Sequence, residues 1–214
     1  MYLSRVEIDR RNRKKNRDLT HLGAYHHWVE ESFPEEIEVG RRSRKLWRID
    51  RINNKEYLLI VSSVKPNRQA LERYGVPGTG EVKEYSGFLA TIKEGQHYRF
   101  RLQLNPVVSL SQGPGKRGRV VPHVTADQQK AYLLNRAEKN GFALEEESFD
   151  LVDRTYLPLR KAGERELRLS SATYEGELVV TDLEHFYRTL TEGMGKKKAY
   201  GFGMMTIIPL VNHE

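Results

Sequence analysis

Residues 97–106 read His-Tyr-Arg-Phe-Arg-Leu-Gln-Leu-Asn-Pro, a run in which polar and apolar side chains alternate up to Asn105-Pro106. A period of two is typical of a β-strand with one buried face and one wet face. Proline cannot donate to a strand ladder, so the strand ends there. Residues 2–9 open the chain with the same alternation, so the stretch at 97–106 indicates that the fold starts a second time in mid-chain.

The sequence that follows this strand predicts a complete α+β unit. A loop rich in glycine and basic residues continues to about residue 122, and Thr125 then predicts the N-cap of a helix that ends at Asn140-Gly141. The remaining elements are two strands, a helix and a closing strand, at residues 149–159, 165–181, 182–191 and 203–210.

The first half has the same order of elements. Asp18 predicts the N-cap of a helix that Pro34 ends, with one apolar face formed by Leu19, Leu22, His26, Val29 and Phe33. A strand pair, a short helix and a closing strand are expected at 46–52, 57–63, 67–74 and 87–92. We therefore predict an α+β protein of two tandem ferredoxin-like (RRM-like) βαββαβ domains with antiparallel sheets, covering residues 1–92 and 96–214.

Composition excludes several classes of protein. The 214 residues include no cysteine, so disulfides, cysteine-bound zinc, iron–sulfur clusters and thiol catalysis are not expected. No apolar run approaches the roughly 18 residues that a membrane helix needs, and the charged N-terminus does not resemble a signal peptide. We expect a cytoplasmic protein with no membrane partner.

The net charge of +7 is concentrated in short basic segments. Several such segments on one folded surface favour contacts with a phosphate backbone at several points. Two of them, at 10–17 and 116–119, supply candidate binding residues, namely Arg11, Arg13, Lys14, Lys15, Arg17, Lys116, Arg117 and Arg119. Two others lie at 41–45 and 196–198.

Three histidines, His21, His26 and His27, lie within seven residues. At these spacings on a helix their side chains do not converge, so we predict neither a metal site nor a cofactor. His26 occupies the apolar face of its helix. It is either a core histidine or a partly buried imidazole at the edge of the helix, where it could transfer protons near neutral pH.

The C-terminal segment Gly193–Gly203 holds four glycines and three lysines. Glycines let backbone N–H groups approach an anion closely, and lysines add positive charge. The segment is not a phosphate-binding P-loop, and it precedes a strand instead of opening a helix, so it is not a dinucleotide fingerprint. Its candidate anion-binding residues are Gly193, Gly195, Lys196, Lys197, Gly201 and Gly203.

Four stretches occur here in one order: Met1-Tyr2-Leu3-Ser4-Arg5-Val6, Arg17-Asp18-Leu19, Tyr98–Leu102 running to Asn105-Pro106, and the glycine motif Gly193–Gly203. Together they resemble the CasE family, the CRISPR repeat-processing endoribonuclease subunit of the type I-E Cascade complex. The resemblance covers the chain from end to end. It implies two ferredoxin-like domains and a metal-independent ribonuclease that cuts CRISPR precursor RNA at the 3′ base of the repeat hairpin.

The resemblance also implies roles for particular residues. The family's catalytic histidine corresponds to His26, and cleavage proceeds by attack of the 2′-hydroxyl. Relatives often carry a tyrosine at the position of Gly23 and a lysine at that of Glu31, so Tyr25 and Lys198 become the candidate catalytic partners. The family's RNA-binding hairpin corresponds to 154–168, with Arg160, Lys161 and Arg165 near its turn. The implied partners are the repeat RNA hairpin and the other Cascade subunits.

Two other functions fit the same composition. A non-catalytic RNA-binding protein of two RRM-like units would share the charge and the fold, although neither half has the aromatic strand pattern that stacks single-stranded bases. A metal-dependent nuclease would need the glutamates of residues 30–38, a run that otherwise resembles a solvated end of a helix.

Overall fold

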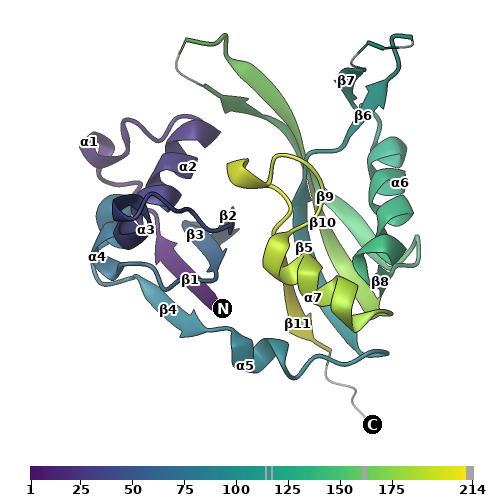
Figure 1. Cartoon of the computed structure of the whole chain (residues 1–214), viewed down its shortest axis with the longest axis horizontal. Coiled ribbons are helices and arrows are strands. Elements are labelled where there is room, and N and C mark those ends of the chain that lie inside the picture. The colour runs from purple at the N-terminus through teal and green to yellow at the C-terminus, as the bar shows by residue number, and fades with distance from the viewer. Residues whose placement is uncertain (114, 117, 161–162, 211–214) are drawn as a thin grey trace.

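The computed structural model describes residues 1–113, 115–116, 118–160 and 163–210. The predictions for Arg117 and Lys161 lie outside these residues. The structure contains two main antiparallel sheets with helices packed against them (Figure 1). The predicted α+β class with antiparallel sheets is therefore confirmed.

The first sheet belongs to the first half of the chain. Its strands are β1 (Tyr2–Glu7), β2 (Lys45–Ile52), β3 (Lys55–Ser62) and β4 (Glu81–Glu84), in the spatial order β2-β3-β1-β4. A two-residue turn joins β2 to β3, with Asn53 and Asn54 both at positive φ. Asparagine tolerates this conformation better than most residues, which explains the tight hairpin.

The main helix of this half is α2 (Leu22–Glu31), and the half also contains the short helices α1 (Arg13–Asn16), α3 (Pro34–Glu38), α4 (Arg68–Leu71), η1 (Glu72–Tyr74) and α5 (Ser86–Leu89). The predicted N-cap at Asp18 is wrong, because Leu19 first turns into the core and the Nδ1 atom of His21 accepts the capping hydrogen bond from Ala24. The basic segment at 10–17 contains the helical turn α1. Pro34 begins α3, and α2 already ends before Ser32.

The predicted closing strand at 87–92 is also wrong. Strand β4 closes the sheet instead by pairing with β1, and residues 86–89 form α5. The buried residues of this segment are Tyr85, Leu89 and Ile92, spaced by four and three positions. This is the spacing of one helical face, and it decides against a strand.

The second half builds a five-stranded sheet from β5 (His97–Leu104), β8 (Phe142–Ala143), β9 (Phe149–Leu159), β10 (Leu167–Val180) and β11 (Met205–Pro209). Its order is β11-β5-β10-β8, and β9 also pairs with β10. Helices α6 (Ala126–Ala137) and α7 (Leu183–Glu192) complete the unit. The predicted N-cap at Thr125 is confirmed, since Thr125 and Gln128 form a capping box.

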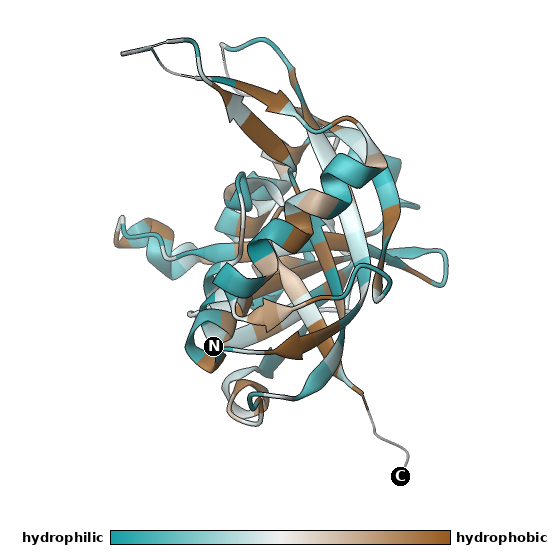
Figure 2. Cartoon of the chain, turned by 90° about the vertical axis from the view of Figure 1, so that its right-hand side faces the viewer, coloured by the Kyte–Doolittle hydropathy of each residue, from teal (hydrophilic) through white to brown (hydrophobic). Residues whose placement is uncertain are grey.

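The stretch before α6, predicted as a loop, is instead a β-hairpin of β6 (Val107–Leu110) and β7 (Arg119–Pro122). Valines on both strands pair across it, with Val108 opposite Val121, which suits the β preference of branched side chains. Figure 2 shows hydrophobic residues along this projecting hairpin, and Val108, Leu110 and Val120 are exposed there.

The two halves share their apolar cores. One hydrophobic cluster joins Leu46 and Val61 to residues of the second sheet, and another joins Trp28 and Trp47 to Phe202. Between the sheets, the fully buried Arg48 of β2 donates hydrogen bonds to the carbonyls of Arg101 and Met204 at 2.7 and 2.9 Å. The junction is therefore a packed interior that holds the two sheets together.

Candidate active site

His26 faces a cavity of about 530 Å³ that the two halves build together. The first half supplies α2 and the loop before β2, and the second half supplies the end of β9 and the 3-10 turn η3 (Lys198–Tyr200). The imidazole is half-buried, whereas the other members of its predicted stripe are buried: Leu19, Leu22, Val29 and Phe33. His26 therefore lies at the edge of the core, where a solvent-borne ligand can reach it.

The C-terminal glycine segment reaches His26 through η3. The ring of Tyr200 meets the imidazole edge-on, with centroids 5.4 Å apart. Trp47 of β2 holds the turn in place, because its indole N–H donates to the carbonyl of Ala199 at 2.9 Å and its ring packs where a Cβ on Gly201 would lie. The structure thus brings His26 and the segment 193–203 together through Tyr200.

The surroundings of His26 favour its neutral form. Burial lowers the pKa of the imidazole, Glu30 opposes this shift, and the positive charges of Arg42 and Lys45 add to it. A neutral imidazole has a free lone pair and can accept a proton. At neutral pH His26 is therefore suited to act as a base.

A buried ionic network lies beside the cavity. The ammonium of Lys45 is bound by Glu36 and lies 3.5 Å from Glu30, with the ring of Phe33 packed against it. Glu36 is 8% exposed and also accepts two hydrogen bonds from Ser43. The interpretation of this glutamate run as a solvated helix end is thus wrong for Glu36, because the chain folds back at Ser43 and brings Lys45 to it.

Gly23 permits a backbone contact between the halves. A Cβ on this residue would lie 2.6 Å from the carbonyl oxygen of Arg160, at the end of β9, and 2.9 Å from the His21 ring. Only glycine fits this approach. The turn end of the β9–β10 hairpin therefore rests directly on the helix that carries His26, and Arg160 and His26 line the same cavity.

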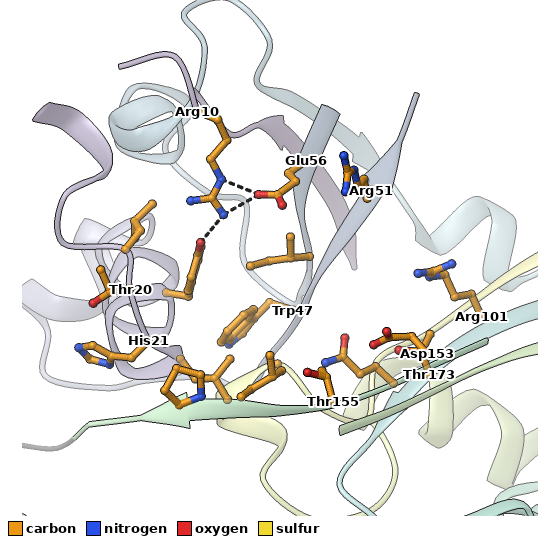
Figure 3. A pocket seen from close by; sticks show the side chains of 18 residues that line it. Arg10, Thr20, His21, Trp47, Arg51, Glu56, Arg101, Asp153, Thr155 and Thr173 are labelled. Carbon is orange, nitrogen blue, oxygen red and sulfur yellow. Dashed lines mark hydrogen bonds and ion pairs between the residues drawn. The ribbon is translucent and has the colours of Figure 1, made fainter. Parts of the chain in front are cut away.

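Tyr25 does not share this cavity. It lines a separate cavity of about 500 Å³ on another side of α2, seen in Figure 3. There its hydroxyl accepts a hydrogen bond from Arg10 at 2.7 Å, Arg10 also binds Glu56, and the ring stacks on Trp47 with centroids 6.0 Å apart. Burial raises the pKa of this hydroxyl. Tyr25 is part of the core, away from the imidazole of His26.

Lys198 also points away from His26. Its ammonium donates to the carbonyl of Gly193 at 3.0 Å and lines a third cavity, of about 470 Å³, with Arg188 and Arg136. Burial, together with the nearby charge of Arg44, lowers its pKa. The side chain ties the two ends of the glycine segment together.

The backbone N–H groups of two predicted anion-binding glycines already donate hydrogen bonds within the protein. The N–H groups of Gly193 and Gly203 donate to the carbonyls of Thr189 and Gln103, at 3.1 and 2.7 Å. At Gly203, φ is +85°, and a Cβ would lie 2.3 Å from a backbone oxygen. The exposed residues of the segment are Gly195, Lys196, Lys197 and Ala199, and Gly201 is buried against Trp47.

The other predicted RNA-binding residues lie on projecting elements. Arg11, Arg13, Lys14 and Arg17 are exposed around α1, whereas Lys15 donates to the carbonyl of Gly75 at 2.6 Å. Lys116 and Arg119 are exposed on the β6–β7 hairpin, and Arg160 and Arg165 are exposed near the end of β9–β10. Both hairpins extend from the same end of the molecule (Figure 1).

The other two histidines of residues 21–27 have local partners. His21 caps α2, and the Nε2 atom of exposed His27 lies 3.2 Å from Glu31. Among the described residues, no group of three His, Asp or Glu side chains is arranged to hold a metal ion. Within the same residues, none of the helices has the length and apolarity that crossing a membrane requires.

Two residues that line the cavity with His26, Tyr200 and Arg42, are not predicted from the sequence as its partners. Tyr200 lies inside the glycine motif, where the glycines and lysines carried the prediction. Arg42 lies in the basic segment 41–45, whose only distinguishing feature in the sequence is its charge. Both are far from residue 26 in the chain, and no periodic pattern connects them to it.

Fold and site together define an α+β protein with two antiparallel sheets and a histidine in a cation-lined cavity between its halves. A family model described as CRISPR associated protein matches residues 1–209. The chain therefore belongs to this family of CRISPR-associated proteins, which includes the Cse3 endoribonucleases, as the resemblance predicted.

Individual relatives match over nearly their full length. The CRISPR-associated endoribonuclease Cse3 of Thermus thermophilus is 29% identical over 220 residues, covering 98% of this chain and 100% of the relative. A structure of Cse3 bound to a 19-nucleotide RNA has 27% identity and a TM-score of 0.78, covering 98% of this chain and 100% of the other. A chain of a CRISPR RNA-guided surveillance complex shares the fold, at 22% identity and a TM-score of 0.73, covering 98% and 100%.

Proposed function

We propose that this protein is a metal-independent endoribonuclease that cleaves CRISPR precursor RNA at the 3′ base of the repeat hairpin. The observation that carries the proposal is the half-buried His26, poised in its neutral form in a cavity that also holds Arg42 and Arg160. A relative that matches over its full length is named an endoribonuclease, and a similar structure is bound to RNA.

The reaction needs proton transfer and charge stabilisation. In our proposal His26 removes the proton of the 2′-hydroxyl, whose oxygen then forms a bond to the adjacent phosphorus. The bond from phosphorus to the 5′-oxygen breaks, that oxygen takes a proton from solvent, and the His26 imidazolium returns its proton to solvent, so the protons balance. The products are a 2′,3′-cyclic phosphate and a 5′-hydroxyl, so neither water nor a redox partner is consumed.

The carboxylates near His26 support a mechanism without a metal. Glu30 and Glu36 bind Lys45, and Glu31 binds Arg73 at 2.5 Å. A divalent cation would have to displace these ammonium and guanidinium groups before it could bind, because each carboxylate is already paired with a positive charge. The chemistry therefore rests on the imidazole and on the cations of the cavity.

Tyr25 and Lys198 enter the proposal as positioning residues. Tyr25 anchors α2 to the core beneath His26 through its contacts with Trp47 and Arg10. Lys198 closes the turn that presents Tyr200 to the imidazole, through its hydrogen bond to Gly193. Neither side chain lines the cavity of His26, so we do not assign either to the reacting atoms.

We propose that the repeat hairpin binds across the end of the molecule where β6–β7 and β9–β10 project. Arg165 and Arg160 are exposed on one hairpin, and Lys116 and Arg119 on the other. Arg160 is then the link between recognition and cleavage, because its backbone rests on α2 at Gly23. Exposed basic residues around α1 add contacts to phosphates.

At the level of the whole chain, we propose two ferredoxin-like (RRM-like) domains, residues 1–92 and 96–214. The strand orders β2-β3-β1-β4 and β11-β5-β10-β8 support this proposal. We further propose that the protein acts in the cytoplasm, keeps its product and joins a Cascade complex. A chain of the same fold in a CRISPR RNA-guided surveillance complex supports this assembly.

The test is cleavage of a repeat-hairpin RNA in the presence of EDTA. We expect one cut at the 3′ base of the stem, with a cyclic phosphate on the upstream product, and no cut in an RNA with a 2′-deoxy substitution at that position. Binding without cleavage would favour an RNA-binding protein without catalytic activity. Cleavage that EDTA abolishes would favour a metal-dependent nuclease.

A further inference from the structure

The guanidinium of Arg42 is the least committed cation in the cavity of His26. Its side chain is 61% exposed. Among the described residues it pairs only with Glu30, through Nε at 3.8 Å, and this ion pair does not use the two Nη atoms. Arg160, by contrast, donates to Glu166 at 2.6 Å, and Lys45 is buried between Glu30 and Glu36. Arg42 is therefore the cation best able to bind an incoming anion.

The chain on either side of Arg42 is held in place. Ser43 donates to Glu36 through its backbone N–H at 3.2 Å and through its hydroxyl at 2.5 Å. On the other side, the N–H of Arg41 donates to the carbonyl of Glu36 at 3.1 Å. Arg42 thus projects from a segment bound at both ends to α3, although the segment has no regular secondary structure.

The field of Arg42 reaches the imidazole, because its positive charge is one cause of the lowered pKa of His26. Glu30 lies on α2 one helical turn after His26, so it holds the guanidinium on the same side of the helix. Glu30 also pairs with Lys45 at 3.5 Å, which fixes its own carboxylate. The positions of His26 and Arg42 are therefore coupled through one glutamate.

We infer that Arg42 binds the scissile phosphate and stabilises its additional negative charge during cleavage, with Glu30 as its positioning residue. This inference rests on the proposed function. As the 2′-oxygen bonds to phosphorus, charge grows on the non-bridging oxygens, and a guanidinium can donate two parallel hydrogen bonds to them. Arginine matches this geometry better than lysine because its donors form a planar fork.

The inference separates Arg42 from Lys198. A charge that stabilises the reacting phosphate has to face the same cavity as the base, and Lys198 lines another cavity with its ammonium bound to Gly193. Tyr200 packs on His26 from the η3 side, so the phosphate would enter between Arg42 and Arg160. The reacting group is then enclosed by residues of both halves of the chain.

The experiment compares Arg42→Ala with Arg73→Ala. Arg73 is a matched control, because it is also an exposed arginine paired with a glutamate of α2, in this case Glu31. Single-turnover cleavage of a repeat-hairpin RNA gives the rate, and a 2′-deoxy version of the same RNA gives the dissociation constant. Circular dichroism melting confirms that each variant is folded.

We expect Arg42→Ala to reduce the cleavage rate about 10²–10³-fold, as the loss of one charge-stabilising donor does in other enzymes. The dissociation constant should change only a few-fold, Arg42→Lys should recover part of the rate, and Arg73→Ala should cleave like the wild type. A rate within threefold of the wild type for Arg42→Ala, or equal losses in the two alanine variants, overturns the inference.

The outcomes also separate this inference from the proposed function. If the wild type cleaves and His26→Ala does not, but Arg42→Ala keeps its rate, the function stands and the role of Arg42 is wrong. If the wild type does not cleave hairpin RNA under any condition, both are wrong. If Arg42→Ala loses affinity in proportion to its rate, Arg42 is a binding residue without a specific effect on the transition state, and the inference is again overturned.

Discussion

Tyr25 and His26 are neighbours in the chain, yet α2 presents them to two different cavities. On the Tyr25 side the polar groups satisfy one another, since Arg10 binds both the tyrosine hydroxyl and Glu56. On the His26 side the pairing is incomplete, and Arg42 keeps donors for a ligand. Successive helical residues point about 100° apart, so one helix can combine an anchoring face with a reactive face. The two faces of α2 thus differ in whether the polar side chains around them already have hydrogen-bond partners within the protein.

The largest effect should come from removing the reactive group. We expect His26→Ala to reduce the single-turnover cleavage rate about 10²–10⁴-fold, because a positioned base contributes this much. Affinity for a 2′-deoxy hairpin and the melting temperature should stay close to the wild-type values. His27→Ala is the matched control, since His27 is exposed and adjacent. A role of His26 in the core alone would instead appear as a loss of stability with little change in rate.

A smaller effect should come from separating the hairpin from the helix. Gly23→Ala places a methyl group against the carbonyl of Arg160, and the turn end of β9–β10 has to move. We expect on the order of 1–3 kcal/mol of lost stability, as for overpacked sites, together with a reduced cleavage rate. Thermal melting and single-turnover kinetics measure the two effects. Gly87→Ala is a suitable control, because nothing lies within 4 Å of a Cβ there. An unchanged rate and melting temperature would show that this contact does not position the site.

The anchoring face should respond with the opposite signature. Tyr25→Phe removes the hydroxyl that Arg10 binds, and it leaves the stacking on Trp47 intact. We expect about 1 kcal/mol of lost stability, the ordinary value of a hydrogen bond, because Arg10 keeps its partner Glu56. Denaturant unfolding measures the loss, and cleavage should stay within about threefold of the wild type. A large loss of cleavage rate with unchanged stability would instead assign Tyr25 a direct role in the reaction.

The smallest effect concerns proton affinity. The charged or titratable groups that act on His26 or line its cavity are Glu30, Glu31, His27, Arg42, Lys45, Arg160 and Tyr200. Burial lowers the pKa of the imidazole below its usual 6.5, so in the free protein His26 should take up its proton only below that pH. Because Glu30 raises this pKa, Glu30→Gln should lower it further, and Arg42→Ala should raise it. NMR titration of the His26 ring measures both directions, and a shift of opposite sign in either variant contradicts the description of the cavity.

Local patterns predicted much of the fold. Strand β5, the capped helix α6 and the pair β9–β10 lie where alternation and capping residues indicated, because these signals act over a few neighbouring residues. The same signals gave wrong predictions where tertiary contacts determine the type or the start of an element. Asp18 is a better N-cap than His21 in isolation, but Leu19 is buried before the helix begins. The apolar residues at 85–92 fit a helix because they face a core that both halves share.

By itself, the sequence determined the family, most of the order of strands and helices, and the candidate base His26, which the family resemblance identifies. Only the tertiary structure decided which groups accompany it. Tyr200 and Arg42 reach the imidazole from distant segments, whereas Tyr25, one residue away, and Lys198 face other cavities. The physical reason is that the side chains of this site come from both halves of the chain and contact one another only where the two halves pack together. Spacing along one helix sets the direction of each residue, but only the packing of the two sheets sets what it meets.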